Sequence, residues 1–203
     1  MNKRNLLRKN LETAWINTIQ LYYNSQLINS EHALQVYFCM ELLKQFEVDK
    51  LQRRVFIEPN IQTNCGKTRF PDVVICNSQK VIGIVELKYT PRGRPSTAKD
   101  LETLSLTTNE PFEIKNDRYH GPQKNLLKNY TVADDAIMCW AGIYSDDRID
   151  LTSIAKEKQF EGRFLQLHGL THEGKDPAIW INERQLSPHE INGSTAPKAS
   201  PAA

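Results

Sequence analysis

Two carboxylates and a lysine could be brought together by a pair of neighbouring strands in the first half of the chain. Asp72 precedes a short apolar run, residues 77–80 are polar and typical of a turn, and residues 81–89 form a second strand-like run. Alternation along the second strand places Glu86 and Lys88 on the same face. The sequence therefore predicts a hairpin that carries three ionisable side chains.

The expected register of this hairpin brings the two acids close together. A turn centred on Ser78 and Gln79 makes the numbers of antiparallel partners sum to about 157. Asp72 then lies opposite Val85, and Glu86 is its diagonal neighbour, within reach across the ladder. The alternative is that the Glu and Lys of the second strand form a solvated pair on an exposed sheet face, which would contribute little to stability.

These residue types suit the hydrolysis of a phosphodiester bond. The carboxylate oxygens of Asp72 and Glu86 are the kind of ligand that Mg²⁺ and Mn²⁺ prefer. A metal ion held there would polarise a phosphoryl oxygen and lower the pKa of a bound water. Lys88 lies one pleat further along the strand and, as a compact cation, would hold the attacking water or stabilise the transition state.

Pro71 directly precedes Asp72, and the pattern Glu86-x-Lys88 begins fourteen residues after Asp72. This arrangement resembles the PD-(D/E)XK nuclease superfamily over residues 30–144. The resemblance implies an α/β fold with a mixed central β-sheet flanked by helices, built on a restriction-endonuclease-like αβββαβ core. It also implies DNA as the substrate and a Mg²⁺ or Mn²⁺ cofactor. Asp72, Glu86 and the main-chain carbonyl of Leu87 would be the metal ligands.

The helix predicted to begin after Ser30 supplies a further acidic candidate. The resemblance implies a Glu on the helix before the sheet that faces the metal site, and Glu31 is the position that matches. The alternative is that Glu31 complements the positive end of the helix dipole. Glu41 is the weaker substitute for Glu31 at the metal site and is expected to face solvent. Glu58 would either enter the carboxylate cluster or pair with a neighbouring arginine.

Four further residues are candidates for contacts with DNA. Arg92 and Arg94 lie in a Gly- and Pro-containing loop directly after the strand of Lys88, where they would reach backbone phosphates. An ordinary solvated loop is the alternative for these arginines. Gln123 and Lys124 lie near the start of a short predicted helix, and the resemblance implies that such a helix places a Gln or Lys near the site.

The remaining elements extend this core at both ends. We predict one domain over residues 1–190, with an N-terminal helix (1–28), a core (30–145) and a C-terminal extension (146–190), followed by a disordered tail (191–203). Periodicity and turn residues predict a helix at 3–24, strands at 54–61, 70–77, 81–90 and 135–144, a helix at 152–159, and a hairpin of strands 164–170 and 178–182. The apolar side of the extra N-terminal helix would pack on the core or, in the alternative, against a second copy of the chain.

Composition favours one globular domain in a reducing, cytoplasmic compartment. The chain has 203 residues, 39% of them hydrophobic, and a formal net charge of +2, which permits nucleic-acid binding without requiring it. Its four cysteines form no Cys-x-x-Cys pair. No secretory signal or membrane span is expected. The segment 66–68 lacks the earlier glycine of a P-loop, which argues against an NTP-driven motor.

We therefore expect a divalent-metal-dependent nuclease that hydrolyses DNA, with Asp72, Glu86, Lys88 and Glu31 as catalytic residues. Its partners would be DNA and either a second copy of the chain or a larger DNA-processing complex. The alternative is a non-catalytic nucleic-acid- or protein-binding subunit of a DNA-processing or defence complex that keeps the nuclease fold. A binding role alone would not need a carboxylate pair beside a lysine, which favours catalysis.

Overall fold

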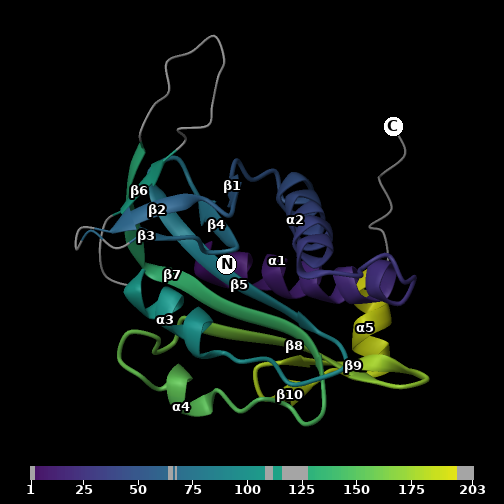
Figure 1. The fold of residues 1–203 in the computed structure, drawn as a ribbon. Helices are drawn as coiled ribbons and strands as arrows, with labels where there is room; N and C mark the ends of the chain where they lie inside the picture. Colours follow the sequence, from purple (N-terminus) through teal and green to yellow (C-terminus); the bar gives the residue numbers. More distant parts are fainter. Residues whose placement is uncertain (1–2, 64–65, 67, 108–111, 116–127, 196–203) are drawn as a thin grey trace, which may run out of the picture.

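The computed structural model describes residues 3–63, 66, 68–107, 112–115 and 128–195 (Figure 1). Their elements, in chain order, are α1 (Lys3–Asn17), the π-helix η1 (Thr18–Tyr23), α2 (Glu31–Val48), β1 (Arg54–Ile57), β2 (Asn60–Thr63), β3 (Thr68–Arg69), β4 (Val73–Cys76), β5 (Lys80–Thr90), α3 (Ala98–Leu106), β6 (Phe112–Lys115), β7 (Lys128–Ser145), α4 (Thr152–Ala155), β8 (Phe164–His172), β9 (Lys175–Ile181), β10 (Arg184–Gln185) and α5 (Pro188–Thr195). Gln123 and Lys124 lie outside the described residues.

The strands form a mixed sheet whose main body follows the order β1-β4-β5-β7-β8-β9-β10. β7 is parallel to both β5 and β8, and the other neighbours in the main body are antiparallel. A small antiparallel arm of β6, β2 and β3 continues from the first part of β7. Apart from this arm, α2, β1, β4, β5, α3 and β7 follow one another as helix, three strands, helix and strand. The predicted α/β class, with a mixed sheet flanked by helices, is confirmed.

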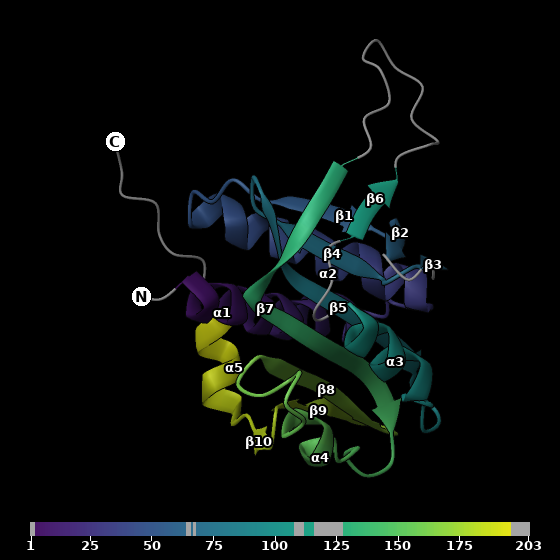
Figure 2. The ribbon, with the colours of Figure 1, turned by 90° about the vertical axis from the view of Figure 1, so that its left-hand side faces the viewer.

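The alternating side chains of β5 explain why helices cover both faces of the sheet. Val85 and Leu87 belong to a core that α1, α2 and α5 cover, whereas Ile84 belongs to a second core under α3 and α4. Figure 2 shows α1 and α5 on one side of the sheet and α3 on the other. The predicted alternation along this strand is confirmed, and it places Glu86 and Lys88 on the α3 side.

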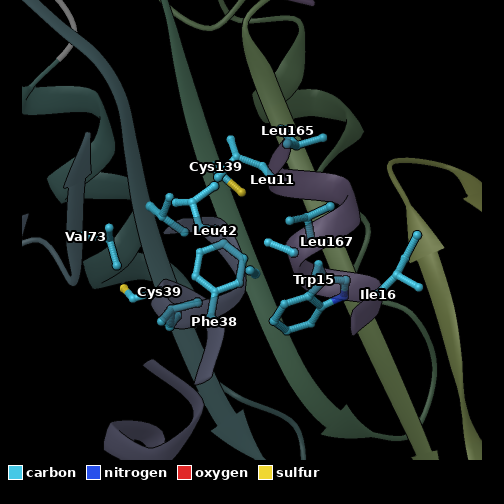
Figure 3. Close-up of a cluster of buried hydrophobic side chains, with 14 of the residues drawn as sticks. Leu11, Trp15, Ile16, Phe38, Cys39, Leu42, Val73, Cys139, Leu165 and Leu167 are labelled. Carbon is cyan, nitrogen blue, oxygen red and sulfur yellow. The ribbon is translucent and has the colours of Figure 1, made fainter. Parts of the chain in front are cut away.

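The N-terminal segment packs on the core, as its apolar stripe predicts. Trp15 is fully buried, and its ring meets that of Phe38 from α2 edge-on, with 6.2 Å between the centroids (Figure 3). The stripe is therefore covered within the chain and is not a surface for a second copy. The predicted continuous helix is wrong at its end, because η1 winds more widely and the N–H of Asn24 donates to the carbonyl of Ile19 at 3.0 Å.

Glu41, predicted to face solvent, is buried between α2 and the N-terminal helices. Its carboxylate accepts hydrogen bonds from Asn17 Nδ2 at 2.9 Å and the Tyr22 hydroxyl at 2.7 Å, and it pairs with Lys44 Nζ at 2.6 Å. Burial works against ionisation of Glu41, but these donors outweigh it and keep its pKa below the ordinary value. The prediction fails because the pattern of one helix does not reveal which of its faces another helix covers.

The substitution Glu41→Ala is expected to lower the free energy of unfolding by about 2–3 kcal/mol, because it leaves the buried amide of Asn17 and the hydroxyl of Tyr22 without their acceptor. Urea denaturation measures the change. Glu47→Ala on an exposed part of the same helix is the control, with an expected effect below about 0.5 kcal/mol. Equal effects of the two substitutions would show that the buried network does not stabilise the fold.

Glu58 interrupts the strand predicted at 54–61. Its φ angle is 44°, outside the β region, and the proline that follows cannot donate to a ladder. The segment 54–61 therefore divides into β1 and β2. Separately, β4 is shorter than the strand predicted at 70–77. β7 is longer than the strand predicted at 135–144 and begins within the region predicted as a helix.

The C-terminal part confirms one prediction and corrects two. β8 and β9 form the predicted hairpin, whereas α4 is a single turn, shorter than the predicted helix at 152–159. α5 occupies residues 188–195, where the tail was predicted to begin at 191. The missed signal is a capping box, in which the N–H of Ser187 donates to Glu190 Oε2 at 2.9 Å and the N–H of Glu190 donates to Ser187 Oγ at 3.4 Å.

Candidate active site

Asp72 lies directly before β4, beside the part of β5 that carries Glu86 and Lys88. Its carboxylate oxygen Oδ2 accepts a hydrogen bond from the main-chain N–H of Leu87 at 2.5 Å. From α2, Gln35 Nε2 donates to the main-chain carbonyl of Asp72 at 2.9 Å. The backbone and side chain of Asp72 are therefore both held in place at the edge of β5.

The register of this hairpin differs by one residue from the prediction. The ladder is irregular at Ile75, and beyond this point Val73 lies opposite Val85. Continued by one residue, the ladder places Asp72 opposite Glu86, so that the two acids are direct rather than diagonal neighbours. A bulge of this kind leaves no mark on the apolar alternation, which explains the error.

Glu31, at the start of α2, reaches the same part of β5. Its Oε1 lies 3.6 Å from Lys88 Nζ, and its Oε2 accepts a hydrogen bond from the N–H of Tyr89 at 3.2 Å. Ser30 caps the helix by accepting from the N–H of Ala33 at 3.1 Å, which sets the direction of this first turn. Glu31 is thus brought to the cluster rather than serving the helix dipole alone, and its side chain is 44% exposed at the mouth of the site.

Asp100 on α3 completes the cluster and was not found from the sequence. Its Oδ1 lies 3.3 Å from Lys88 Nζ, and its Oδ2 accepts a hydrogen bond from Trp140 Nε1 at 3.1 Å. The indole itself needs space on β7, where Gly142 lies beside Lys88 in the parallel ladder. A Cβ on this glycine would meet the Trp140 ring at 2.6 Å. The missing side chain of Gly142 therefore allows Trp140 to hold Asp100 against the lysine.

The sequence contains a signal that could have revealed Asp100. The buried residues of α3 are Asp100, Thr103 and Leu104, which share one face of the helix at the three- and four-residue spacing. An acid on the apolar face of a helix is costly unless it has a partner. A helix that connects two parallel strands packs on the sheet between them, so this acid points toward the face that carries Lys88.

The cluster is buried rather than a solvated surface pair, which contradicts the alternative interpretation of Glu86 and Lys88. Glu86 is 5% exposed, and the side chain of Asp100 is 3% exposed. The side chain of Lys88 is 23% exposed, so its charged end lies close to the mouth of the site. Four carboxylates, those of Glu31, Asp72, Glu86 and Asp100, gather around this one ammonium group.

Burial and mutual repulsion oppose the ionisation of these acids. Burial raises the pKa of Glu86 to about 9, and the negative charges of Asp72 and Asp100 add to the shift. Burial also raises the pKa of Asp72 to about 6, although the N–H of Leu87 and the charge of Lys88 oppose this. Burial works against the charge of Lys88, but Asp100 and Glu31 outweigh it and raise its pKa. The cluster therefore holds protons that a cation could replace.

The donors open to a divalent metal ion in this cluster are carboxylate and main-chain carbonyl oxygens. Glu86 Oε1 is buried and accepts no hydrogen bond from any described residue. The N–H of Leu87 faces Asp72, so the carbonyl of Leu87 points to the same side of β5. The continued ladder places Pro71 opposite Leu87, and because proline has no N–H it cannot donate to this carbonyl. Within the described residues no three Asp, Glu, His or Cys side chains could hold a metal unaided. Mg²⁺ often needs only one or two carboxylates, with waters and substrate phosphate completing its shell.

The other predicted residues lie outside this cluster. The N–H of Glu58 donates to the carbonyl of Asp72 at 3.0 Å, yet its side chain turns to His32, with 3.5 Å between Oε1 and Nε2. Among the described residues, Glu58 therefore neither joins the cluster nor pairs with Arg53 or Arg54. Arg94 Nη1 donates to the carbonyl of Asp147 at 3.2 Å, and Arg92 lines a hollow beyond the end of β5. The contacts of both arginines with DNA stay a prediction.

Comparisons with protein-family models, with curated proteins and with solved structures find no match for this chain. The case for its function therefore depends on the geometry and chemistry of the cluster. Among the helices that the structure describes, none is long and apolar enough to cross a membrane.

Proposed function

We propose that this chain is a divalent-metal-dependent nuclease that hydrolyses DNA phosphodiester bonds and has a restriction-endonuclease-like core. The observation that carries the proposal is the gathering of buried Glu86 and Asp100 and half-buried Asp72 around Lys88, with Glu31 at the mouth. Such a concentration of buried carboxylates is unfavourable for folding alone, and it becomes useful when a cation binds there. The order of helices and strands around the cluster supports the same class.

In this proposal Asp72, Glu86 and the carbonyl of Leu87 hold Mg²⁺ or Mn²⁺. The bound ion would supply charge neutralisation at the phosphate and make a water more acidic. The hydrogen bond from the N–H of Leu87 fixes one oxygen of Asp72 and leaves the other free to bind. Because Glu86 retains a proton near neutral pH, metal binding at this residue would release it.

Lys88 is the residue that would act on the reacting atoms. Asp100 and Glu31 lie on two sides of its ammonium group, at 3.3 Å and 3.6 Å, and limit its movement. In this position its N–H groups can orient an attacking water or donate to a phosphate oxygen as negative charge develops. Asp100 does not need to touch substrate, because the indole of Trp140 and the ammonium of Lys88 occupy its oxygens. Asp100 is therefore a positioning residue.

The proposal is tested by incubating supercoiled, linear duplex and branched DNA with the full chain and Mg²⁺ or Mn²⁺. Asp72→Asn keeps an acceptor for the N–H of Leu87 but removes the charge, and we expect cleavage to fall by about 100-fold or more. Glu58→Gln is the matched control, since its exposed side chain lies outside the cluster, and we expect unchanged cleavage. Equal cleavage by Asp72→Asn and the native chain would contradict the proposed site, and DNA binding without cleavage would favour the non-catalytic subunit.

A further inference from the structure

A hollow of about 770 Å³ opens directly beyond the proposed catalytic strand. The loop after β5, the last residue of β7 and the turn between β8 and β9 line it, and Tyr23 from η1 forms part of its wall. β5, β7 and β8 are parallel, so their carboxyl ends meet at one edge of the sheet, as Figure 1 shows. Ligands commonly bind at such an edge in α/β proteins. A second hollow of about 540 Å³ shares Tyr23, Tyr89 and Pro91 with it. Both volumes suit a ligand of nucleotide size.

Two tyrosine rings line both hollows. The rings of Tyr23 and Tyr89 lie edge to face, with 6.4 Å between the centroids, and both are half-buried. The hydroxyl of Tyr89 donates to the carbonyl of Ile28 at 2.8 Å, which fixes the direction of this ring. Tyr23 is the last residue of η1, and π-helical segments are frequent at functional sites. Fixed aromatic rings at an open hollow are suited to stacking on a nucleobase.

Donors for a phosphate stand at the rim of the same hollow. Within the described part of the chain, the Arg92 guanidinium and the His172 ring have no hydrogen-bond or ion-pair partner. Their loops are fixed, because Thr171 Oγ1 donates to the carbonyl of Pro91 at 2.7 Å and the N–H of Ser145 donates to that of Gly93 at 3.1 Å. Glu173 also lines the hollow, and its carboxylate can accept from a base amino group. The rim therefore offers an arginine and an imidazole to an anionic ligand.

The hollow and the carboxylate cluster are connected through Glu31. One oxygen of this carboxylate faces Lys88 Nζ at 3.6 Å, and the other accepts from the N–H of Tyr89 at 3.2 Å. Lys88 and Tyr89 are consecutive, so their Cα atoms are about 3.8 Å apart. Their side chains leave β5 on opposite faces of the sheet, so a DNA strand would pass from a phosphate held at Lys88 around the end of β5 to a nucleotide in the hollow.

We propose that this hollow binds one unpaired nucleotide of a DNA strand next to the bond that is cut, with the base against Tyr23 and Tyr89 and a phosphate on Arg92 and His172. The inference depends on the proposed nuclease function for the identity of the strand. Inside a duplex, both faces of a base are covered by its stacked neighbours, so a base that lies on these rings has left the stack. The substrate is therefore a single strand or a duplex with a single-stranded end, flap or branch.

Binding of a fluorescein-labelled single-stranded oligonucleotide, followed by anisotropy with Ca²⁺ in place of Mg²⁺, tests the proposal independently of cleavage. Tyr23→Ala and Arg92→Ala are expected to weaken this binding about tenfold each, with a smaller effect on a blunt duplex of the same sequence. Tyr23→Phe keeps the ring and is expected to bind within about twofold of the native chain. Arg53→Ala, at the opposite end of the sheet, is the matched control for the arginine, with no expected effect.

The outcomes separate this site from the proposed chemistry. Dependence of single-strand binding on Tyr23 and Arg92 supports the site even when no variant cleaves DNA. If Tyr23→Ala and Arg92→Ala bind and cleave the single strand as well as the native chain does, the proposed site is overturned, even when the native chain is a nuclease. Thymidine 5′-monophosphate is expected to compete with the oligonucleotide. Binding of this mononucleotide without binding of the oligonucleotide overturns the assignment to a DNA strand. Because Arg92 is exposed, its substitution leaves the fold intact and keeps the test valid.

Discussion

Glu86→Gln is expected to make the metal-free protein more stable than the native chain at about pH 8, although it removes a residue of the proposed active site. The pKa of Glu86 is raised to about 9 in the folded protein by burial and by neighbouring carboxylates, against about 4.3 in an unfolded chain. The folded state therefore binds this proton more tightly. The resulting stabilisation is complete at low pH and is lost as the pH rises from about 4.3 toward 9.

Glutamine has no proton to lose, so the variant does not share this decline. At about pH 8 we expect an advantage of about 2 kcal/mol for Glu86→Gln, which corresponds to a melting temperature about 5 °C higher for a chain of this size. Thermal unfolding in EDTA at a series of pH values measures the difference. The pKa of Asp72 is raised to about 6, so ionisation of this residue lowers the stability of both proteins in the same direction but at lower pH.

Saturating Mg²⁺ is expected to reverse the order of the melting temperatures, so that the native chain melts above Glu86→Gln. The ion would bind the ionised Glu86 of the native chain and raise its melting temperature, whereas the glutamine variant would gain much less. The variant would also lose DNA cleavage. A variant that melts with or below the native chain in EDTA at every pH would show that Glu86 ionises in the ordinary way. The burial argument for a cation site would then fail.

The residues found from the sequence are those whose placement depends on short stretches of chain. Period-two alternation is a local property of β5, and it placed Glu86 and Lys88 on one face correctly. A helix that begins at a serine cap is also local, and it placed Glu31 in the first turn of α2. The relation between Asp72 and Glu86 depends on the pairing of two strands, where one irregularity at Ile75 changed the register.

The residues missed from the sequence depend on contacts between elements far apart in the chain. Asp100 meets Trp140 forty residues later, and this contact exists because α3 crosses the sheet above β7 and Gly142 leaves room for the indole. Glu41 is buried because α1 and η1 cover the outer side of α2, which the pattern of α2 alone does not show. Both errors concern acids that are buried by contacts with other elements. Asp100 finds its polar partners on β5 and β7, and Glu41 finds two of its three partners on α1 and η1.

Lys88→Met is expected to have the largest effect on cleavage, a loss of about 100- to 1,000-fold, because it removes the cation that stabilises charge at the reacting phosphate. It also leaves the buried carboxylate of Asp100 without its ion pair. We expect the free energy of unfolding to fall by about 2 kcal/mol, less than for a fully buried pair because Lys88 lies near the mouth. Arg69→Met breaks the more exposed pair with Glu102 and is the control, with an expected change below about 0.5 kcal/mol.

A second substitution separates the role of Lys88 in stability from its role in cleavage. Asp100→Asn in the Lys88→Met background removes the uncompensated charge while keeping an acceptor for Trp140 Nε1, so we expect stability to return close to that of the native chain. Cleavage should stay at the level of Lys88→Met, because no cation has been restored. Recovery of cleavage in the double variant would mean that the lysine acts only by supporting the fold. Stability that returns while cleavage stays low places the ammonium group itself in the reaction.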